Sequence, residues 1–131
     1  MRLTAGFTGL LFVALLMMLP GSASAETRVA LILGNAAYSQ IEPLENPVND
    51  ATDISTKLKE VGFEVIDGIN LDNDKMRRVV KRFSDALTDA DVAVFFYAGH
   101  AVQVNGQNFL APIDTDLKRE SDLDFETISL D

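Results

Sequence analysis

One histidine has the surroundings of a residue that moves protons. His100 follows the apolar run 91–97 and the small pair Ala98-Gly99, and it is the only histidine in the 131 residues. An imidazole ionises near pH ~6.5, so it can accept and release a proton at neutral pH. A glycine beside it lets the backbone approach a substrate closely. A histidine with no chemical task is the alternative, but a place after a glycine at the carboxyl end of a predicted strand favours catalysis.

Other kinds of chemistry find little support in the residue types. One histidine and no cysteine leave carboxylates as the only further metal ligands, and neither HxxxH nor HExxH spacing occurs. The segment GNAAYS at 34–39 lacks the GxGxxG pattern of dinucleotide-binding folds, and no Walker A or GxSxG motif is present. The absence of cysteine also excludes a disulfide and a thiol nucleophile within these residues. We therefore expect no metal and no cofactor.

The amino-terminal segment 1–25 has the layout of a secretory signal peptide. Arg2 precedes an apolar run at 10–19, and the small residues Ala23-Ser24-Ala25 follow. The run is shorter than the ~20 residues that cross a bilayer as a helix. The sequence therefore predicts cleavage after Ala25, no stable membrane anchor, and a mature domain at 26–131 in the bacterial periplasm or outside the cell.

The mature segment is acidic. Without Arg2 the chain carries 10 Lys and Arg against 20 Asp and Glu. Such a surface repels phosphate backbones, so nucleic acid is not an expected partner. The basic residues between Lys75 and Arg82 are interpreted as the solvated face of a helix.

Short apolar runs alternate with amphipathic segments along the mature chain. The runs predict strands, and apolar residues at intervals of three and four predict helices. The expected strands are 27–33, 63–66 and 91–97, the expected helices begin at Asn49 or Asp50 and at Asp72 or Asn73, and an expected hairpin at 101–110 turns at Asn105-Gly106. A further helix is expected at 122–130. This order predicts an α/β fold, a three-layer α-β-α sandwich with a mainly parallel sheet and 91–97 in its middle.

Four segments resemble the amino-terminal part of the caspase-like cysteine peptidases (peptidase family C14), in particular the bacterial metacaspase-type or p20-like members. They are RVALILGNAAY at 28–38, LENPVNDA at 44–51, LKEVGFEV at 58–65 and VFFYAGHAVQVNGQNFLAPID at 94–114. The last is the most specific, because strand, small residues, histidine and hairpin occur there in order. The resemblance covers residues 28–117 and implies a caspase-like fold, cysteine-type endopeptidase activity, and peptides or proteins as substrates.

The resemblance also implies roles for individual residues. His100 matches the catalytic histidine, the acid and base of peptide-bond hydrolysis. The next residue in the family is usually a glycine whose N–H helps form the oxyanion hole; here it is Ala101, which keeps the N–H but adopts positive φ less readily. Asp50 matches an acidic position that binds arginine or lysine before the scissile bond, although an acid that caps the helix or lies in its first turn is the alternative. Tyr97 is interpreted as a core residue.

The nucleophile of the family is absent. A caspase cysteine lies roughly 50 residues beyond the histidine, whereas 31 residues follow His100 and none of them is cysteine. We expect the domain to be cut short before the strand that carries the cysteine, so that this part of an exported peptidase is inactive alone. Two alternatives stay open: a non-catalytic caspase-like module for binding or assembly, whose open sheet edge pairs with another chain, and an α/β module for a small ligand.

Overall fold

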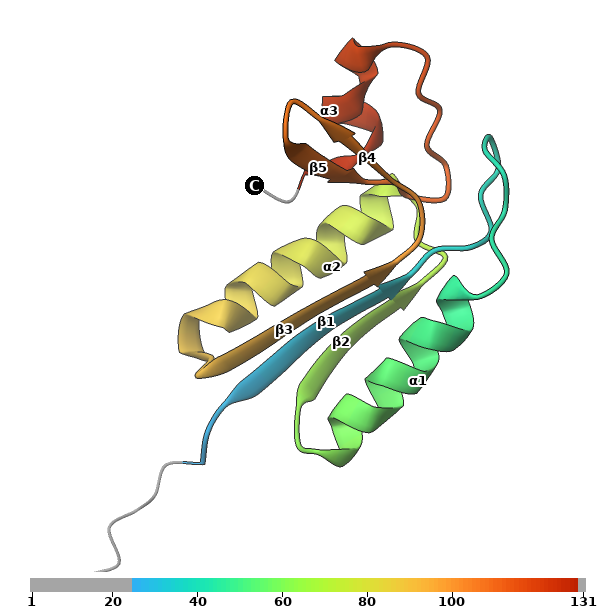
Figure 1. Ribbon diagram of the computed structural model, residues 1–131. Helices are drawn as coiled ribbons and strands as arrows, with labels where there is room; N and C mark the ends of the chain where they lie inside the picture. The colour runs from blue at the N-terminus through green and yellow to red at the C-terminus, as the bar shows by residue number, and fades with distance from the viewer. Residues whose placement is uncertain (1–24, 130–131) are drawn as a thin grey trace, which may run out of the picture.

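A parallel sheet between two helical layers forms the centre of the computed structural model, which describes residues 25–129. The strands are β1 (Arg28–Gly34), β2 (Glu64–Ile69) and β3 (Val92–Ala98), in the order β2-β1-β3. α1 (Pro47–Glu60) covers one face and α2 (Asn73–Ala86) covers the other (Figure 1). The predicted three-layer α/β architecture is confirmed. The predicted signal peptide, except for Ala25, lies outside the described residues.

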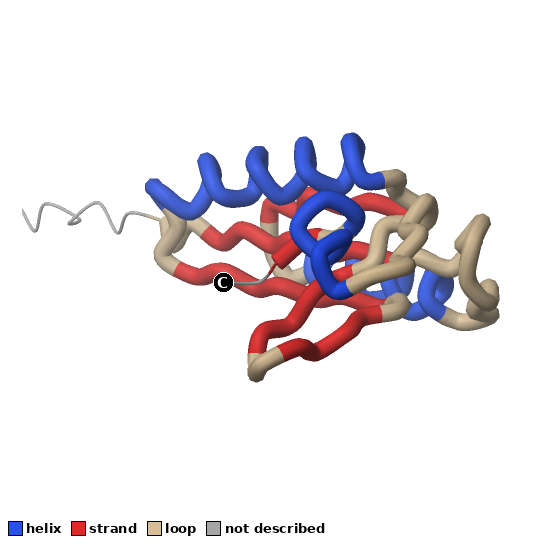
Figure 2. The backbone as a smooth tube through the Cα atoms, turned by 90° about the horizontal axis from the view of Figure 1, so that it is seen from above, coloured by secondary structure: helices blue, strands red, loops and turns tan. Residues whose placement is uncertain are grey.

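The two helical layers follow from the alternation of side chains along β1. Leu31 and the residues two positions away from it pack in the core that contains Met76 of α2. Ala30 and Ile32 face the opposite way and pack with Ala51 of α1. A strand buried on both faces has the continuous apolar run that the sequence displays. Figure 2 shows α2 lying along its face of the sheet.

Among the described strands the middle one is β1 and β3 lies at an edge, so the predicted place of 91–97 in the middle of a longer sheet stays a prediction. Among the described strands, β3 pairs only with β1, and Phe95 on it remains 41% exposed. Right-handed crossovers explain this order. α1 carries the chain from β1 to one side, and α2, on the opposite face, carries it back across β1 to the other side. Apolar composition could not separate the two places, because both strands are rich in branched or aromatic residues.

The first helix begins earlier than predicted. α1 starts at Pro47 and has Asn46 as its N-cap, whereas the sequence predicts Asn49 or Asp50 there. A proline suits the first helical position because its φ is already helical and its missing N–H would have no partner there. Asp50 therefore lies within the first turn and does not cap the helix.

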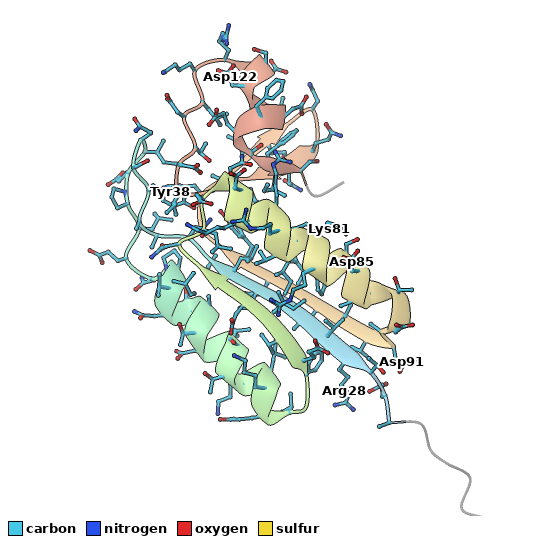
Figure 3. The ribbon with its side chains drawn as sticks, turned by 180° about the vertical axis from the view of Figure 1, so that it is seen from behind. Arg28, Tyr38, Lys81, Asp85, Asp91 and Asp122 are labelled. Carbon is cyan, nitrogen blue, oxygen red and sulfur yellow. The ribbon has the colours of Figure 1, made fainter. Side chains whose placement is uncertain are left out.

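The second helix begins where the sequence predicts. The Asp72 side chain caps α2 by accepting a hydrogen bond from the N–H of Lys75 at 2.9 Å. The basic residues of this helix are exposed, as the interpretation of a solvated face requires. Lys81 forms an ion pair with Asp85 at 2.8 Å on the surface of α2 (Figure 3).

A second, small sheet lies beyond the carboxyl end of β3 (Figure 1). β4 (Ala101–Val104) and β5 (Gln107–Leu110) form the predicted hairpin. Asn105 and Gly106 adopt φ of 52° and 85° at its turn, which confirms the predicted turn residues. β6 (Ile128–Ser129) pairs with β5 on the side away from β4.

The predicted helix at 122–130 is largely replaced by other structure. A 3-10 turn (Glu120–Asp122) leads into the single-turn α3 (Leu123–Glu126), and β6 follows it. The chain leaves the helix at Thr127, whose carbonyl accepts a hydrogen bond from Arg77 of α2 at 2.9 Å. A tertiary contact and pairing with β5 thus override the local helical pattern, and Arg77 has a protein partner in addition to solvent.

Candidate active site

The imidazole of His100 is fixed by a main-chain oxygen. His100 follows Gly99 directly after β3, and its Nε2 lies 2.8 Å from the carbonyl oxygen of Glu42. A carbonyl oxygen only accepts hydrogen bonds, so Nε2 must carry the hydrogen. In the neutral ring the lone pair then lies on Nδ1. Nδ1 is therefore the atom of this side chain that can take up a proton.

The backbone of His100 is held on both sides by tyrosine hydroxyls. The Tyr38 hydroxyl accepts a hydrogen bond from the His100 N–H at 2.7 Å, and the Tyr97 hydroxyl donates one to the His100 carbonyl at 2.6 Å. The Tyr38 ring also packs against the imidazole, with ring centroids 4.7 Å apart. Figure 3 shows Tyr38 at the end of the main sheet, near the chain that leads into the small sheet. These contacts hold the residue without engaging its ring nitrogens.

The two tyrosine hydroxyls lie 3.2 Å apart, in a partly buried setting that keeps them protonated at neutral pH. Burial raises the pKa of Tyr97 far above its usual range, and the hydrogen bond with Tyr38 raises it further. Burial also raises the pKa of Tyr38. A Cβ at Gly99 would lie 2.5 Å from the Tyr97 hydroxyl oxygen and 2.6 Å from that of Tyr38, so this position requires glycine. Tyr97 packs against the core, as predicted, and in addition positions the backbone of His100.

The N–H of Ala101 points away from the neighbouring strand of the hairpin. The Ala111 N–H donates to the His100 carbonyl at 3.0 Å, and the register pairs Ala101 with Leu110. Hydrogen-bonded and non-hydrogen-bonded pairs alternate along an antiparallel ladder, so Ala101 and Leu110 form a non-hydrogen-bonded pair. The Ala101 N–H is therefore directed to the open side of β4, an edge strand. Ala101 is not among the described residues with positive φ, so its Cβ causes no backbone strain here.

This fold occurs in a known family of peptidases. A family model described as the caspase domain, peptidase C14, matches residues 27–131. The chain belongs to this peptidase family. The match confirms the resemblance inferred from the sequence, and with it the caspase-like fold class.

Two mammalian proteins are similar to this caspase domain. The chain is 30% identical over 90 residues to the human mucosa-associated lymphoid tissue lymphoma translocation protein 1, an alignment that covers 69% of this chain and 11% of that protein. It is 29% identical over 94 residues to the homolog of that protein in the mouse, which covers 72% of this chain and 11% of the relative. The chain thus spans a small part of the length of the relatives it matches.

Hydrogen bonds fix the loop that contains Glu42 to the rest of the domain at two points. The side-chain oxygen of Asn70 accepts hydrogen bonds from the N–H groups of Ala36 at 2.9 Å and Ala37 at 3.0 Å. Further along the loop, the Ser39 N–H donates to the carbonyl of Ile113 at 2.9 Å. The orientation of the imidazole therefore depends on the end of β2 and on the segment after β5, as well as on β3.

Asn35 joins the same parts of the chain from the interior. It is fully buried directly after β1, and its side-chain oxygen accepts a hydrogen bond from the Leu71 N–H at 2.9 Å. Its Nδ2 donates to the carbonyl of Ala111 at 3.1 Å, and its N–H donates to the carbonyl of Ala98 at 2.9 Å. A buried amide is stable only where such partners satisfy it. Asn35 thus connects the ends of all three central strands with the end of β5.

Asp50 is exposed in the first turn of α1. Within the described residues it forms no ion pair with a lysine or arginine, and no hydrogen bond joins its side chain to His100. Because Asn46 is the N-cap, the capping alternative for Asp50 is wrong. The favourable interaction of a first-turn acid with the helix dipole remains an alternative to substrate binding.

Two further features bear on the site. Among residues 25–129, no three histidine or acidic side chains gather in a group that could hold a metal ion. Over the same range, no helix is both long and apolar enough to cross a bilayer.

Proposed function

We propose that this caspase domain supplies the histidine part of a cysteine-type endopeptidase site, with His100 as the acid and base of peptide-bond hydrolysis. The observation that carries the proposal is the hydrogen bond between Nε2 and the Glu42 carbonyl, which leaves Nδ1 to exchange protons. The 131 residues contain no cysteine, so the attacking thiol must come from residues outside them.

The proposed mechanism uses three groups in turn. A thiolate sulfur bonds to the substrate carbonyl carbon, and the carbonyl oxygen becomes an oxyanion that accepts a hydrogen bond from the Ala101 N–H. Protonated Nδ1 of His100 gives its proton to the leaving amine as the C–N bond breaks. Water then adds to the acyl carbon, a proton from that water passes to Nδ1, and the C–S bond breaks to return the thiolate.

We also propose export of the domain to the periplasm or the outside of a bacterial cell. The support is the order of Arg2, the apolar run at 10–19 and the small residues that end at Ala25. The substrates would then be peptides or proteins in that compartment.

The activity can be tested with the native full-length protein and fluorogenic peptides that carry arginine, lysine or aspartate before the scissile bond. We expect cleavage after arginine or lysine and a loss of about a hundredfold or more after alkylation with iodoacetamide, because alkylation blocks the nucleophilic thiolate. Cleavage that survives alkylation would contradict a cysteine mechanism. No cleavage of any peptide would favour the binding or assembly alternative, for which the outer edge of β3 with exposed Phe95 is an available surface.

Asp50→Asn in the same protein tests the proposed preference for basic residues. We expect kcat/KM for an arginine peptide to fall about tenfold, because a charge-assisted hydrogen bond to the guanidinium is lost. Asp53→Asn is the matched control, since it removes an equal charge from an exposed position on the same helix. It is expected to change kcat/KM by less than about twofold, as exposed charges are screened. Equal effects of the two variants would show that Asp50 does not bind the substrate side chain.

A further inference from the structure

An apolar hollow of about 260 Å³ lies directly beside the proposed catalytic histidine. His100 forms part of its wall, and the rest of the lining includes Ile41, Val102 and Leu117. Ile41 and Val102 are 38% and 37% exposed, so two large aliphatic side chains that line one hollow are open to solvent. The hollow is therefore a place where a ligand would remove apolar surface from water.

Apart from the two groups assigned to catalysis, Nδ1 of His100 and the N–H of Ala101, the polar groups considered in this hollow have partners within the protein. Thr115 is 2% exposed, and its hydroxyl lies 2.8 Å from the carbonyl oxygen of Pro112 and 3.1 Å from that of Glu126, either of which can accept its one hydrogen. The carbonyl of Ala111 accepts from Nδ2 of Asn35 and from the hydroxyl of Tyr38. A polar ligand would gain few new hydrogen bonds from these groups, so the hollow favours an aliphatic side chain.

A second hollow of about 330 Å³ continues from the first along the hairpin. The two share Val102 and Leu117, and the second is lined in addition by Val104, Leu123 and the charged residues 118–120. Val102 and Val104 lie on the same face of β4, about 6.8 Å apart, which is also the spacing of alternate side chains in an extended peptide. We call these two hollows together the hairpin groove.

The chemistry of His100 decides which part of a substrate lies in the hairpin groove. A general acid must reach the leaving amine, so the imidazole lies on the carboxyl side of the scissile bond. The first hollow has the histidine in its wall and therefore adjoins the first residue after that bond. We propose that the hairpin groove binds aliphatic side chains at the first and third positions after the scissile bond. This inference rests on the proposed function of His100.

Binding of product-like peptides tests the proposal without any need for a thiol. The probes are Leu-Gly-Leu-Gly amide, Leu-Gly-Ser-Gly amide and Ser-Gly-Ser-Gly amide, each with a free amino terminus like the new end of a cleaved chain. In titrations of the ¹⁵N-labelled protein we expect the amide signals of 101–104 and 117–119 to shift. Each leucine replaced by serine should weaken binding about tenfold, because the buried apolar area is lost.

Val102→Ser is expected to weaken binding of the two-leucine peptide about tenfold. Val61→Ser is its matched control, because Val61 is a 58% exposed valine at the end of α1, outside the hairpin groove. If Val102→Ser fails to fold, Ile41→Ser on the exposed loop serves in its place. Equal binding of all three peptides, shifts confined to other surfaces, or equal effects of the two valine variants would overturn the proposal.

The outcome is separable from that of the proposed function. If leucine peptides bind in the hairpin groove but cleavage proves independent of His100, the groove binds peptides and the catalytic assignment fails. If cleavage depends on His100 but no peptide shifts the amides of the hairpin groove, only the inference about the groove fails.

Discussion

Cleavage is expected to fall by a factor of about 10³ to 10⁴ when His100 is replaced by alanine in a full-length protein that carries this domain and a cysteine. No second histidine is present among the 131 residues to exchange protons in its place. The measurement is kcat/KM on an arginine peptide. The fold should survive, because Tyr38 and Tyr97 bind the main-chain groups of His100 and these remain in the variant.

His100→Gln separates proton transfer from the positioning of the loop. The glutamine amide nitrogen is at the same position along the side chain as Nε2 and can donate to the Glu42 carbonyl, but it takes up no proton at neutral pH. We expect this variant to be as inactive as the alanine variant, with an unfolding temperature close to that of the unmodified protein. If either variant kept more than about a tenth of the activity, a general acid and base at this position would be contradicted.

The layers of the fold could be predicted from the sequence, whereas the order of the strands could not. Continuous apolar runs and helical spacing reveal which segments are strands or helices, because each pattern reports local burial. Strand order depends on how the crossovers return the chain, and the run 91–97 is as apolar as β1 although β3 is an edge strand among the described strands. At Thr127, pairing and the contact with Arg77 outweigh a local helical pattern in the same way.

The candidate site could be predicted only as far as single side chains reveal it. The place of His100 after a strand and a glycine is visible in the sequence, and its catalytic role stays a prediction. The group that orients its ring is a main-chain oxygen of Glu42, 58 residues away, and any residue type could supply such an oxygen. No sequence pattern identifies Tyr38, which is 62 residues from His100, as a hydrogen-bond partner of its backbone. Only the meeting of loops at the carboxyl ends of the strands is a general feature of such sheets.

Asn35→Ala is expected to lower the free energy of unfolding by about 2 to 3 kcal/mol. The Leu71 N–H loses its acceptor in the interior, and an unsatisfied buried donor is costly. The Ala111 carbonyl loses the Asn35 donor but keeps the Tyr38 hydroxyl, so most of the lost stability comes from the unsatisfied N–H of Leu71. Urea unfolding of the protein measures the change.

Asn108→Ala is the matched control, because Asn108 is exposed on β5 and its side chain accepts one hydrogen bond, from Gln103 at 3.1 Å. We expect it to cost less than about 0.5 kcal/mol, since water replaces the lost partner. Hydrogen exchange at the Leu71 amide should accelerate in Asn35→Ala more than exchange in α1 does. That local difference would show that Asn35 holds the strand ends that orient the histidine loop. Equal losses of stability in the two asparagine variants would contradict the role of the buried Asn35 amide in joining the strand ends.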